Sequence, residues 1–166
     1  YIYVVRDPRA VVCSLANHSS ISLEKATAEV LNEKFIGYNG PYKLAELPGS
    51  WKINYLSWKK KKNFNGLIIR YEDLIDNPEK EFKKILNFMK KIININYDEE
   101  KISKSIISCE FSRLSKMEDD QGFEEISNSK FFRKGTKDSW KNDLDRNLRK
   151  KIEENFKNEM IELGYL

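Results

Sequence analysis

The sequence is short of several residue types, and each shortage excludes a class of protein. Its 166 residues include only two cysteines and one histidine, which is too few for a disulfide framework and fits a reducing compartment. No cluster has the spacing of metal ligands, and no apolar run approaches the roughly 18 residues that a membrane helix needs. We therefore expect a cytoplasmic protein that uses neither a metal nor a membrane.

The abundant residues are those of a folded, mildly basic domain. Hydrophobic residues make up 40% of the chain, which excludes a disordered tail, and the formal net charge is +4. This charge is well below that of a nucleic-acid-binding surface, so we expect no nucleic acid partner. Lysines number 23 and arginines only seven. Each arginine is therefore of interest, because its planar guanidinium suits bidentate contact with phosphate or carboxylate.

The apolar pattern predicts an α/β fold with a parallel sheet. Continuous apolar runs at 1–5 and 67–69 are typical of strands covered on both faces. A connecting turn is expected at 70–74, and a polar, mobile loop at 115–129. Helical spacing predicts helices over 10–17, 22–35, 51–62, 78–89, 98–108 and from 144 until Gly164. The order of strand, helices, strand, helices indicates three layers, αβα, around the sheet.

The first predicted strand begins at the first residue, Tyr1, without a methionine. A chain seldom starts on its most buried element, and two strands are too few for an independent α/β sheet. We therefore expect residues 1–166 to be the C-terminal part of one longer domain, with further strands before Tyr1.

Polar residues follow the first predicted strand, at the edge where parallel sheets bind ligands. Asp7 can cap the next helix, with Pro8 in its first turn. Ser14 lies two helical turns on, so Arg6 and Ser14 could hold one phosphate group. The alternatives are a capped helix start with exposed charges at Arg6 and Arg9, and a Ser14 hydroxyl bonded to its own helix.

Two other segments carry similar residues. The second strand is followed by Arg70-Tyr71-Glu72-Asp73, where Arg70 could instead pair with a neighbouring carboxylate. Near the end, Phe131-Phe132-Arg133-Lys134-Gly135 offers a fork, a point charge and a backbone that a phosphate can approach closely. Its aromatic rings could cover a base, and the alternative is a basic surface loop.

In order and spacing, these motifs resemble the C-terminal part of the cytosolic-type sulfotransferase family, which uses 3′-phosphoadenylyl sulfate (PAPS). The resemblance covers essentially the whole chain and implies a P-loop NTPase-like sulfotransferase fold. Its motifs are Val-Val-Arg-Asp-Pro-Arg-Ala-Val-Val-Cys-Ser at 4–14, Gly-Ser-Trp at 49–51, Arg-Tyr-Glu-Asp-Leu at 70–74, Asn-Pro-Glu-Lys-Glu at 77–81 and Arg-Lys-Gly at 133–135.

The resemblance implies a cofactor-binding role for each matched residue. Arg6 and Ser14 would hold the 3′-phosphate, with 133–135 closing over the same group, while aromatic residues contact the adenine. Cys109 replaces the usual threonine, and Asp138-Ser139 replaces the usual Gly-Asp before a tryptophan. The implied set is Arg6, Ser14, Tyr71, Cys109, Phe111, Phe132, Arg133, Lys134 and Gly135.

The resemblance also implies in-line transfer of a sulfuryl group from PAPS to a hydroxyl or amine of a small-molecule or glycan acceptor, without a metal. The family's phosphosulfate-binding lysine loop and histidine base lie upstream of the part that matches this chain, so the catalytic residues are expected before Tyr1. The only histidine, His18, is expected to have a solvated or helix-end role. Residues 1–166 would supply the 3′-phosphoadenosine half of the site and be inactive alone.

Two other classes of protein remain as alternatives. One is a fragment of a P-loop nucleotide kinase or NTPase, and the other is a non-enzymatic module that binds RNA or acidic partners through basic loops. Two clusters are also open to a second interpretation. The aromatic residues Trp51, Tyr55 and Trp58 could line an acceptor pocket or belong to the core, and the acidic residues at 118–120 are expected in a solvated loop rather than a metal site.

Overall fold

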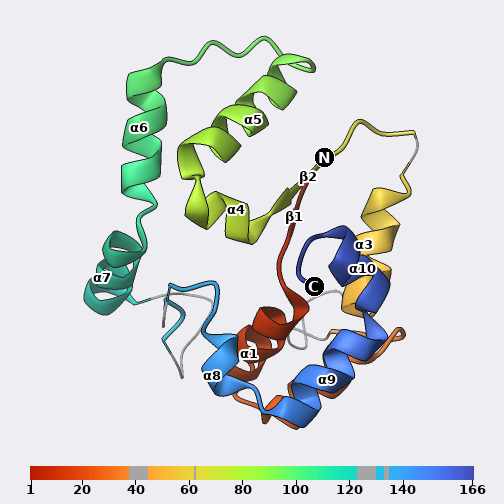
Figure 1. Ribbon diagram of the computed structural model, residues 1–166. Coiled ribbons are helices and arrows are strands. Elements are labelled where there is room, and N and C mark those ends of the chain that lie inside the picture. The colour runs from red at the N-terminus through yellow and green to blue at the C-terminus, as the bar shows by residue number, and fades with distance from the viewer. Residues whose placement is uncertain (38–44, 62, 123–129, 133–134) are drawn as a thin grey trace.

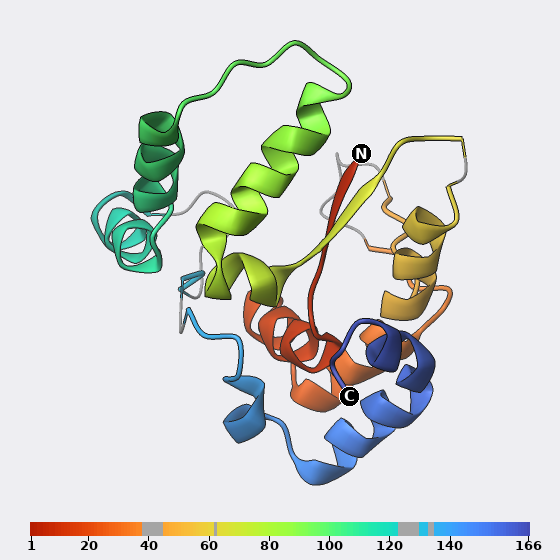
Figure 2. The same ribbon diagram turned by 45° about the horizontal axis from the view of Figure 1, so that its top comes forward.

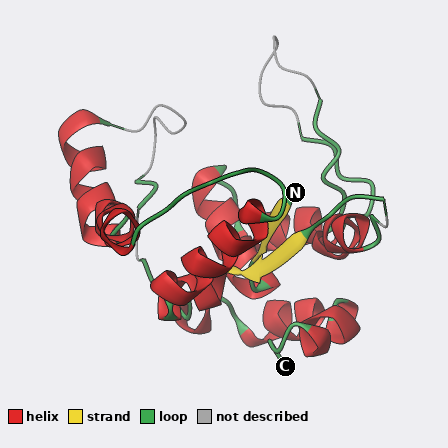
Figure 3. Cartoon of the chain, turned by 90° about the horizontal axis from the view of Figure 1, so that it is seen from above, coloured by secondary structure: helices red, strands yellow, loops and turns green. Residues whose placement is uncertain are grey.

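The computed structural model describes residues 1–37, 45–61, 63–122, 130–132 and 135–166. Strand β1 (Ile2–Val5) pairs in parallel with β2 (Leu67–Arg70), with Val5 opposite Arg70. Figure 3 shows these two strands at the centre, with helices around them. The helices are α1 (Pro8–His18), α2 (Leu23–Leu31), α3 (Trp51–Lys59), α4 (Tyr71–Asp76), α5 (Pro78–Lys90), α6 (Glu99–Ser108), α7 (Phe111–Gln121), α8 (Trp140–Asp143), α9 (Arg146–Asn155) and α10 (Lys157–Glu162). None of these helices is long and apolar enough to cross a membrane in the part of the chain that the structure describes.

The hydrophobic core lies against one face of the strands. Helices α1, α3, α9 and α10 gather on this side (Figure 1). Val5 of β1 is buried with Val12 of α1, Tyr55 of α3 and Ile152 of α9. Burial of such side chains is the main stabilising contribution to folding, so the end of β1 and the start of α1 are fixed by the core itself.

The other side of the strands is covered unevenly. Helix α5 runs beside β2, while α6 and α7 lie farther from the strands (Figures 1 and 2). The side chains of Ile2 and Val4 are 41% and 46% exposed. The prediction that residues 1–5 are covered on both faces is therefore wrong for the described residues, because α5 contacts β2 and leaves this face of β1 open.

Local signals explain most helix boundaries. The Asp7 side chain accepts a hydrogen bond of 2.9 Å from the Arg9 backbone N–H, and Pro8 is the first residue of α1, as predicted. Ser22 caps α2 and Ser50 caps α3 in the same way. These two helices end earlier than predicted, at Leu31 and Lys59.

Three predicted segments differ from the structure. The turn expected at 70–74 is replaced by α4, whose first turn carries two acidic residues that favour a helix N-terminus. The loop expected at 115–129 is helical as far as Gln121, because good helix formers such as Lys, Met, Glu and Gln sustain a helix without an apolar face; 123–129 lies outside the described residues. The final helix is divided into α9 and α10 at Phe156, which is buried and has the non-helical angles φ −114° and ψ 17°.

Candidate functional site

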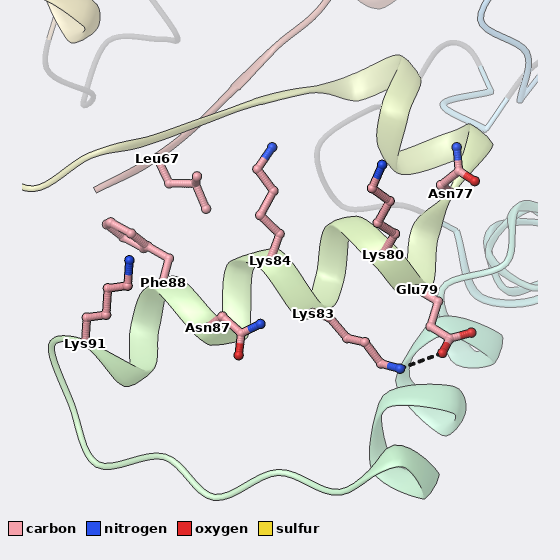
Figure 4. A pocket seen from close by; sticks show the side chains of 9 residues that line it. All are labelled: Leu67, Asn77, Glu79, Lys80, Lys83, Lys84, Asn87, Phe88 and Lys91. Atoms are coloured by element: carbon pink, nitrogen blue, oxygen red, sulfur yellow. Dashed lines mark hydrogen bonds and ion pairs between the residues drawn. The ribbon is translucent and has the colours of Figure 1, made fainter.

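The described residues line at least two cavities large enough to hold a small molecule. The larger, of about 740 Å³, runs along α5, where Lys80, Lys84 and Lys91 lie on the same side of the helix as Leu67 (Figure 4). It contains none of the residues predicted to bind the cofactor, although Asn77, Glu79 and Lys80 belong to the motif at 77–81. Leu67 is the first residue of β2, so this cavity begins at the amino end of the strand, opposite the edge where parallel sheets bind ligands.

The smaller cavity, of about 420 Å³, lies beyond the carboxyl ends of both strands. Its lining includes every predicted cofactor-binding residue that the structure describes. Arg133 and Lys134, also predicted, lie outside the described residues. The predicted residues in the lining are Arg6, Ser14, Tyr71, Cys109, Phe111, Phe132 and Gly135.

One wall of this cavity, here called the inner wall, consists of Arg6, Ser14 and Tyr71. The Arg6 guanidinium carbon lies 4.5 Å from the centre of the Tyr71 ring, a cation–π contact. The Arg6 carbonyl accepts a hydrogen bond of 2.9 Å from the Trp51 indole N–H. The Arg6 Nε is buried and has no hydrogen-bond partner among the described residues, so this donor can serve a ligand.

Ser14 lies on α1, two helical turns after the Asp7 cap, and is exposed to the cavity. Its hydroxyl makes no hydrogen bond to any described residue. The alternative of a hydroxyl bonded to its own helix is therefore not observed.

A buried hydrogen-bond network holds the two strand ends behind the inner wall. One Glu72 carboxylate oxygen accepts from the Asp7 backbone N–H at 3.0 Å, and the other accepts from the Tyr165 hydroxyl at 2.8 Å. Burial and the charge of Glu72 raise the pKa of Tyr165, so this tyrosine remains a donor. The C-terminal segment thereby joins the turn after β1, which contains Arg6 and Asp7, to α4, which carries Tyr71.

Arg9 belongs to this network and does not line the cavity. Its guanidinium contacts both oxygens of Asp7, Oε1 of Glu153 at 2.5 Å and the ring of Trp140 at 3.9 Å. Burial would lower the pKa of Arg9, but the Asp7 and Glu153 carboxylates raise it above its usual value. The expectation of exposed charges at the start of α1 is wrong for Arg9, which is only 4% exposed.

Arg70 also has a structural partner, as the sequence allowed. Its guanidinium lies 4.7 Å from the centre of the Tyr165 ring, and one terminal nitrogen is 3.9 Å from an Asp73 oxygen. Arg70 is not in the lining of the 420 Å³ cavity.

The facing wall, here called the outer wall, consists of Cys109, Phe111, Phe132 and Gly135. Gly135 has φ +61°, and a Cβ atom built there would lie 2.4 Å from Cγ of Phe111. The backbone of Gly135 therefore packs directly on the Phe111 ring, and only glycine fits there. Phe132 meets Phe111 edge to face with 6.2 Å between ring centres, and Cys109 is an exposed free thiol at the end of α6.

His18 is a lining residue whose position the sequence analysis missed. It is exposed at the end of α1, as expected, and it also lines the cavity one helical turn after Ser14. The spacing of four residues between Ser14 and His18 was the signal that could have found it.

The aromatic residues Trp51 and Tyr55 are buried in the core and not in either cavity. Within the described ranges, no group of three or more His, Cys, Asp or Glu side chains could hold a metal ion.

Comparison with known proteins identifies the family. The sulfotransferase domain model matches residues 1–164, so the chain belongs to the sulfotransferase family. The chain is 31% identical over 170 residues to sulfotransferase 1 family member D1 of Mus musculus, covering 96% of this chain and 54% of that protein. It is 27% identical over 165 residues to flavonol 4′-sulfotransferase of Flaveria chlorifolia, covering 92% of this chain and 50% of that protein. The chain thus spans about half the length of the curated relatives it matches, and the family match decides against a nucleotide kinase or NTPase fragment.

Solved structures confirm the predicted sulfotransferase fold. The mouse sulfotransferase SULT7A1, complexed with PAP, is similar with a TM-score of 0.72 and 24% identity, covering 96% of this chain and 57% of that one. Retinol dehydratase in a complex with retinol and PAP is similar with a TM-score of 0.68 and 21% identity, covering 96% of this chain and 47% of that one.

Proposed function

We propose that the 420 Å³ cavity binds the 3′-phosphoadenosine part of PAPS, in a protein that transfers a sulfuryl group to a hydroxyl or amine of a small-molecule or glycan acceptor. One observation carries this proposal. Seven residues between positions 6 and 135, each assigned to the nucleotide by its place in a family motif, line a single cavity at the carboxyl ends of both strands.

The inner wall fits a phosphate group. The Arg6 Nε donor is buried without a partner among the described residues, and the Ser14 side chain is exposed in the lining of the cavity. A phosphate oxygen satisfies both donors, and a charge-assisted hydrogen bond to arginine is among the stronger contacts in proteins. Arg6 and Ser14 would therefore bind the 3′-phosphate, and Tyr71 would hold the guanidinium in place.

The outer wall fits a purine base. Phe111 and Phe132 present two aromatic rings at an edge-to-face angle of 74°, and aromatic rings stack on bases without preference for sequence. The glycine at 135 allows the backbone to approach this ring closely. When bound, PAPS would supply the sulfuryl group for transfer, and these residues would orient the nucleotide.

We propose that residues 1–166 form the C-terminal part of one cytoplasmic sulfotransferase domain. In this proposal the general base and the phosphosulfate-binding lysine lie outside residues 1–166. The described part of the cavity would bind and orient the nucleotide but would not activate the acceptor.

Isothermal titration calorimetry of adenosine 3′,5′-bisphosphate with the complete protein tests this function. Arg6→Ala should weaken binding about tenfold or more, because one charged hydrogen-bond donor to phosphate is lost. Arg146→Ala is the matched control, since Arg146 is exposed on α9 and outside the cavity. The proposal is wrong if the complete protein does not bind this nucleotide, or if Arg6→Ala binds it as well as wild type does. Salt-dependent RNA binding that Arg6→Ala leaves unchanged would instead support a nucleic-acid-binding module.

A further inference from the structure

The acidic residues of α7, expected to be solvated, hold the segment that leads into the outer wall. The Glu118 carboxylate accepts two backbone hydrogen bonds, from the Phe131 N–H at 2.5 Å and from the Phe132 N–H at 2.8 Å. Beside it, the Lys130 ammonium lies 2.7 and 2.8 Å from the two oxygens of Asp119. Three consecutive residues of this segment are therefore bound to two consecutive residues of one helix.

The two backbone bonds fix the direction of the chain just before 133–135. Both N–H groups point at the same carboxylate, which limits rotation of the peptide units on either side of Phe131. Because α7 begins at Phe111 and Glu118 lies seven residues later, one helix supplies both the ring against Gly135 and the acceptor for Phe132. The Asn17 amide also donates to the Lys130 carbonyl at 3.2 Å, which ties the segment to α1.

We propose that Glu118 is a positioning residue for nucleotide binding, which sets Phe132 of the outer wall against the adenine base. This inference rests on the proposed function and deepens it. Glu118 is not in the lining of the cavity and acts through the backbone of Phe131 and Phe132.

The chemistry of the contact makes the role specific to a carboxylate. An ionised carboxylate offers acceptors on both oxygens, and here each oxygen takes one N–H group. Glutamine keeps one acceptor and presents an NH₂ donor to the other N–H, so Glu118→Gln should behave nearly as Glu118→Ala does. A residue needed only for helix packing would tolerate glutamine, which has nearly the same shape.

The experiment compares two nucleotides in the complete protein. Calorimetry should show that Glu118→Gln weakens adenosine 3′,5′-bisphosphate and adenosine 5′-monophosphate alike, by about tenfold, because both carry the adenine that the outer wall would contact, whereas Arg6→Ala should weaken mainly the bisphosphate. Asp120→Asn is the matched control, because Asp120 is an exposed carboxylate on the same helix with no partner among the described residues, and it should leave both affinities unchanged. No loss for either nucleotide, or a loss confined to the bisphosphate, would overturn the inference.

Amide hydrogen exchange separates this inference from the proposed function. In Glu118→Gln the amides of Phe131 and Phe132 should exchange at least about tenfold faster, with or without nucleotide, because each loses its acceptor or is repelled. If wild type fails to bind adenosine 3′,5′-bisphosphate, the proposed function fails, and faster exchange would show only that the contact exists. If Arg6→Ala weakens binding and Glu118→Gln does not, the proposed function stands and the positioning role is refuted.

Discussion

The two walls of the cavity are built in different ways. The inner wall rests on a network whose charged members are almost inaccessible to solvent: Asp7 is 5% exposed, Arg9 4% and Glu72 7%. The outer wall is held by contacts on the surface, such as the ion pair of Lys130 and Asp119, whose side chains are 40% and 59% exposed. Both walls face one cavity, but only the inner wall is backed by a buried network of charged residues.

Because of this difference, substitutions in the two walls should affect different properties, stability for the inner wall and nucleotide affinity for the outer wall. Breaking a buried charge pair leaves its partner uncompensated and destabilises the fold, whereas an exposed ion pair contributes about 0–1 kcal/mol. Substitutions behind the inner wall should therefore lower stability first, and binding as a consequence. Substitutions in the outer wall should change nucleotide affinity while most of the stability remains.

The largest effect is expected for Arg9→Met. This change removes the guanidinium between Asp7 and Glu153 and leaves the Asp7 carboxylate buried without its counter-charge. The free energy of unfolding should fall by about 3–5 kcal/mol, as measured by urea denaturation.

Arg149→Met is a close control for Arg9→Met. Arg149 also bonds Glu153, at 2.8 Å, and lies 5.1 Å from the ring of Trp140, but its side chain is 48% exposed. Arg149→Met should therefore lower the free energy of unfolding by no more than about 1 kcal/mol. Equal losses for the two variants would show that burial does not distinguish the inner wall.

A smaller effect on stability, but a clear one on binding, is expected for Gly135→Ala. The new Cβ would lie 2.4 Å from the Phe111 ring, at a backbone φ of +61° that costs a non-glycine residue about 1–2 kcal/mol. The ring must move, so affinity for adenosine 3′,5′-bisphosphate should fall about tenfold by calorimetry.

Gly122→Ala isolates the backbone cost, since Gly122 also has a positive φ, +75°, with no atom within 4 Å of the added Cβ. It should lower stability and leave nucleotide affinity unchanged. Adding Phe111→Ala to Gly135→Ala should recover part of the stability lost through the clash. If the Gly122 and Gly135 variants bind adenosine 3′,5′-bisphosphate equally well, the close contact between Gly135 and the Phe111 ring does not affect nucleotide binding.

The sequence predicted the strands and the start of α1 well because their signals are local. An apolar run predicts a strand, and Asp7-Pro8 predicts the helix that follows it. Helix α4 was predicted as a turn because its first turn is polar, and α7 was predicted as a loop from residue 115 because residues 115–121 are mostly polar. The division between α9 and α10 at Phe156 depends on its burial in the core, which no local pattern contains.

Partners distant in the sequence account for what could not be predicted about the site. Arg9 looked like an exposed charge because Glu153 and Tyr165, which help to bury it, lie more than 140 residues away. Glu118 was missed for another reason. Its partners are the backbone N–H groups of Phe131 and Phe132, and no residue type in the sequence identifies a backbone donor. The family motifs selected residues that share one cavity and left out Arg9 and Arg70, and the structure gives the reason: these two arginines contact other protein groups and do not line the cavity.

The smallest effect on stability at neutral pH is expected for Tyr3→Phe, which changes only the strand that leads into the inner wall. Tyr3 of β1 donates to Oδ1 of Asn54 at 2.8 Å, and burial raises its pKa from 10.0 to about 12. The folded state then holds the proton more tightly than the unfolded state. The stability from neutral Tyr3 is therefore complete below about pH 10 and is lost as pH rises towards about 12.

Tyr3→Phe should cost about 1 kcal/mol at pH 7, through the lost hydrogen bond, and should make the decline of unfolding free energy between pH 10 and about 12 less steep than in wild type. Urea denaturation across this range measures both effects. Tyr97→Phe, which removes the exposed hydrogen bond of Tyr97 to Asn87, is the control for loss of a tyrosine hydroxyl outside the strands. If the free energy of unfolding declines equally steeply in wild type and Tyr3→Phe, Tyr3 of β1 does not cause the loss of stability at alkaline pH. The two walls would then differ in burial without differing in how their stability responds to pH.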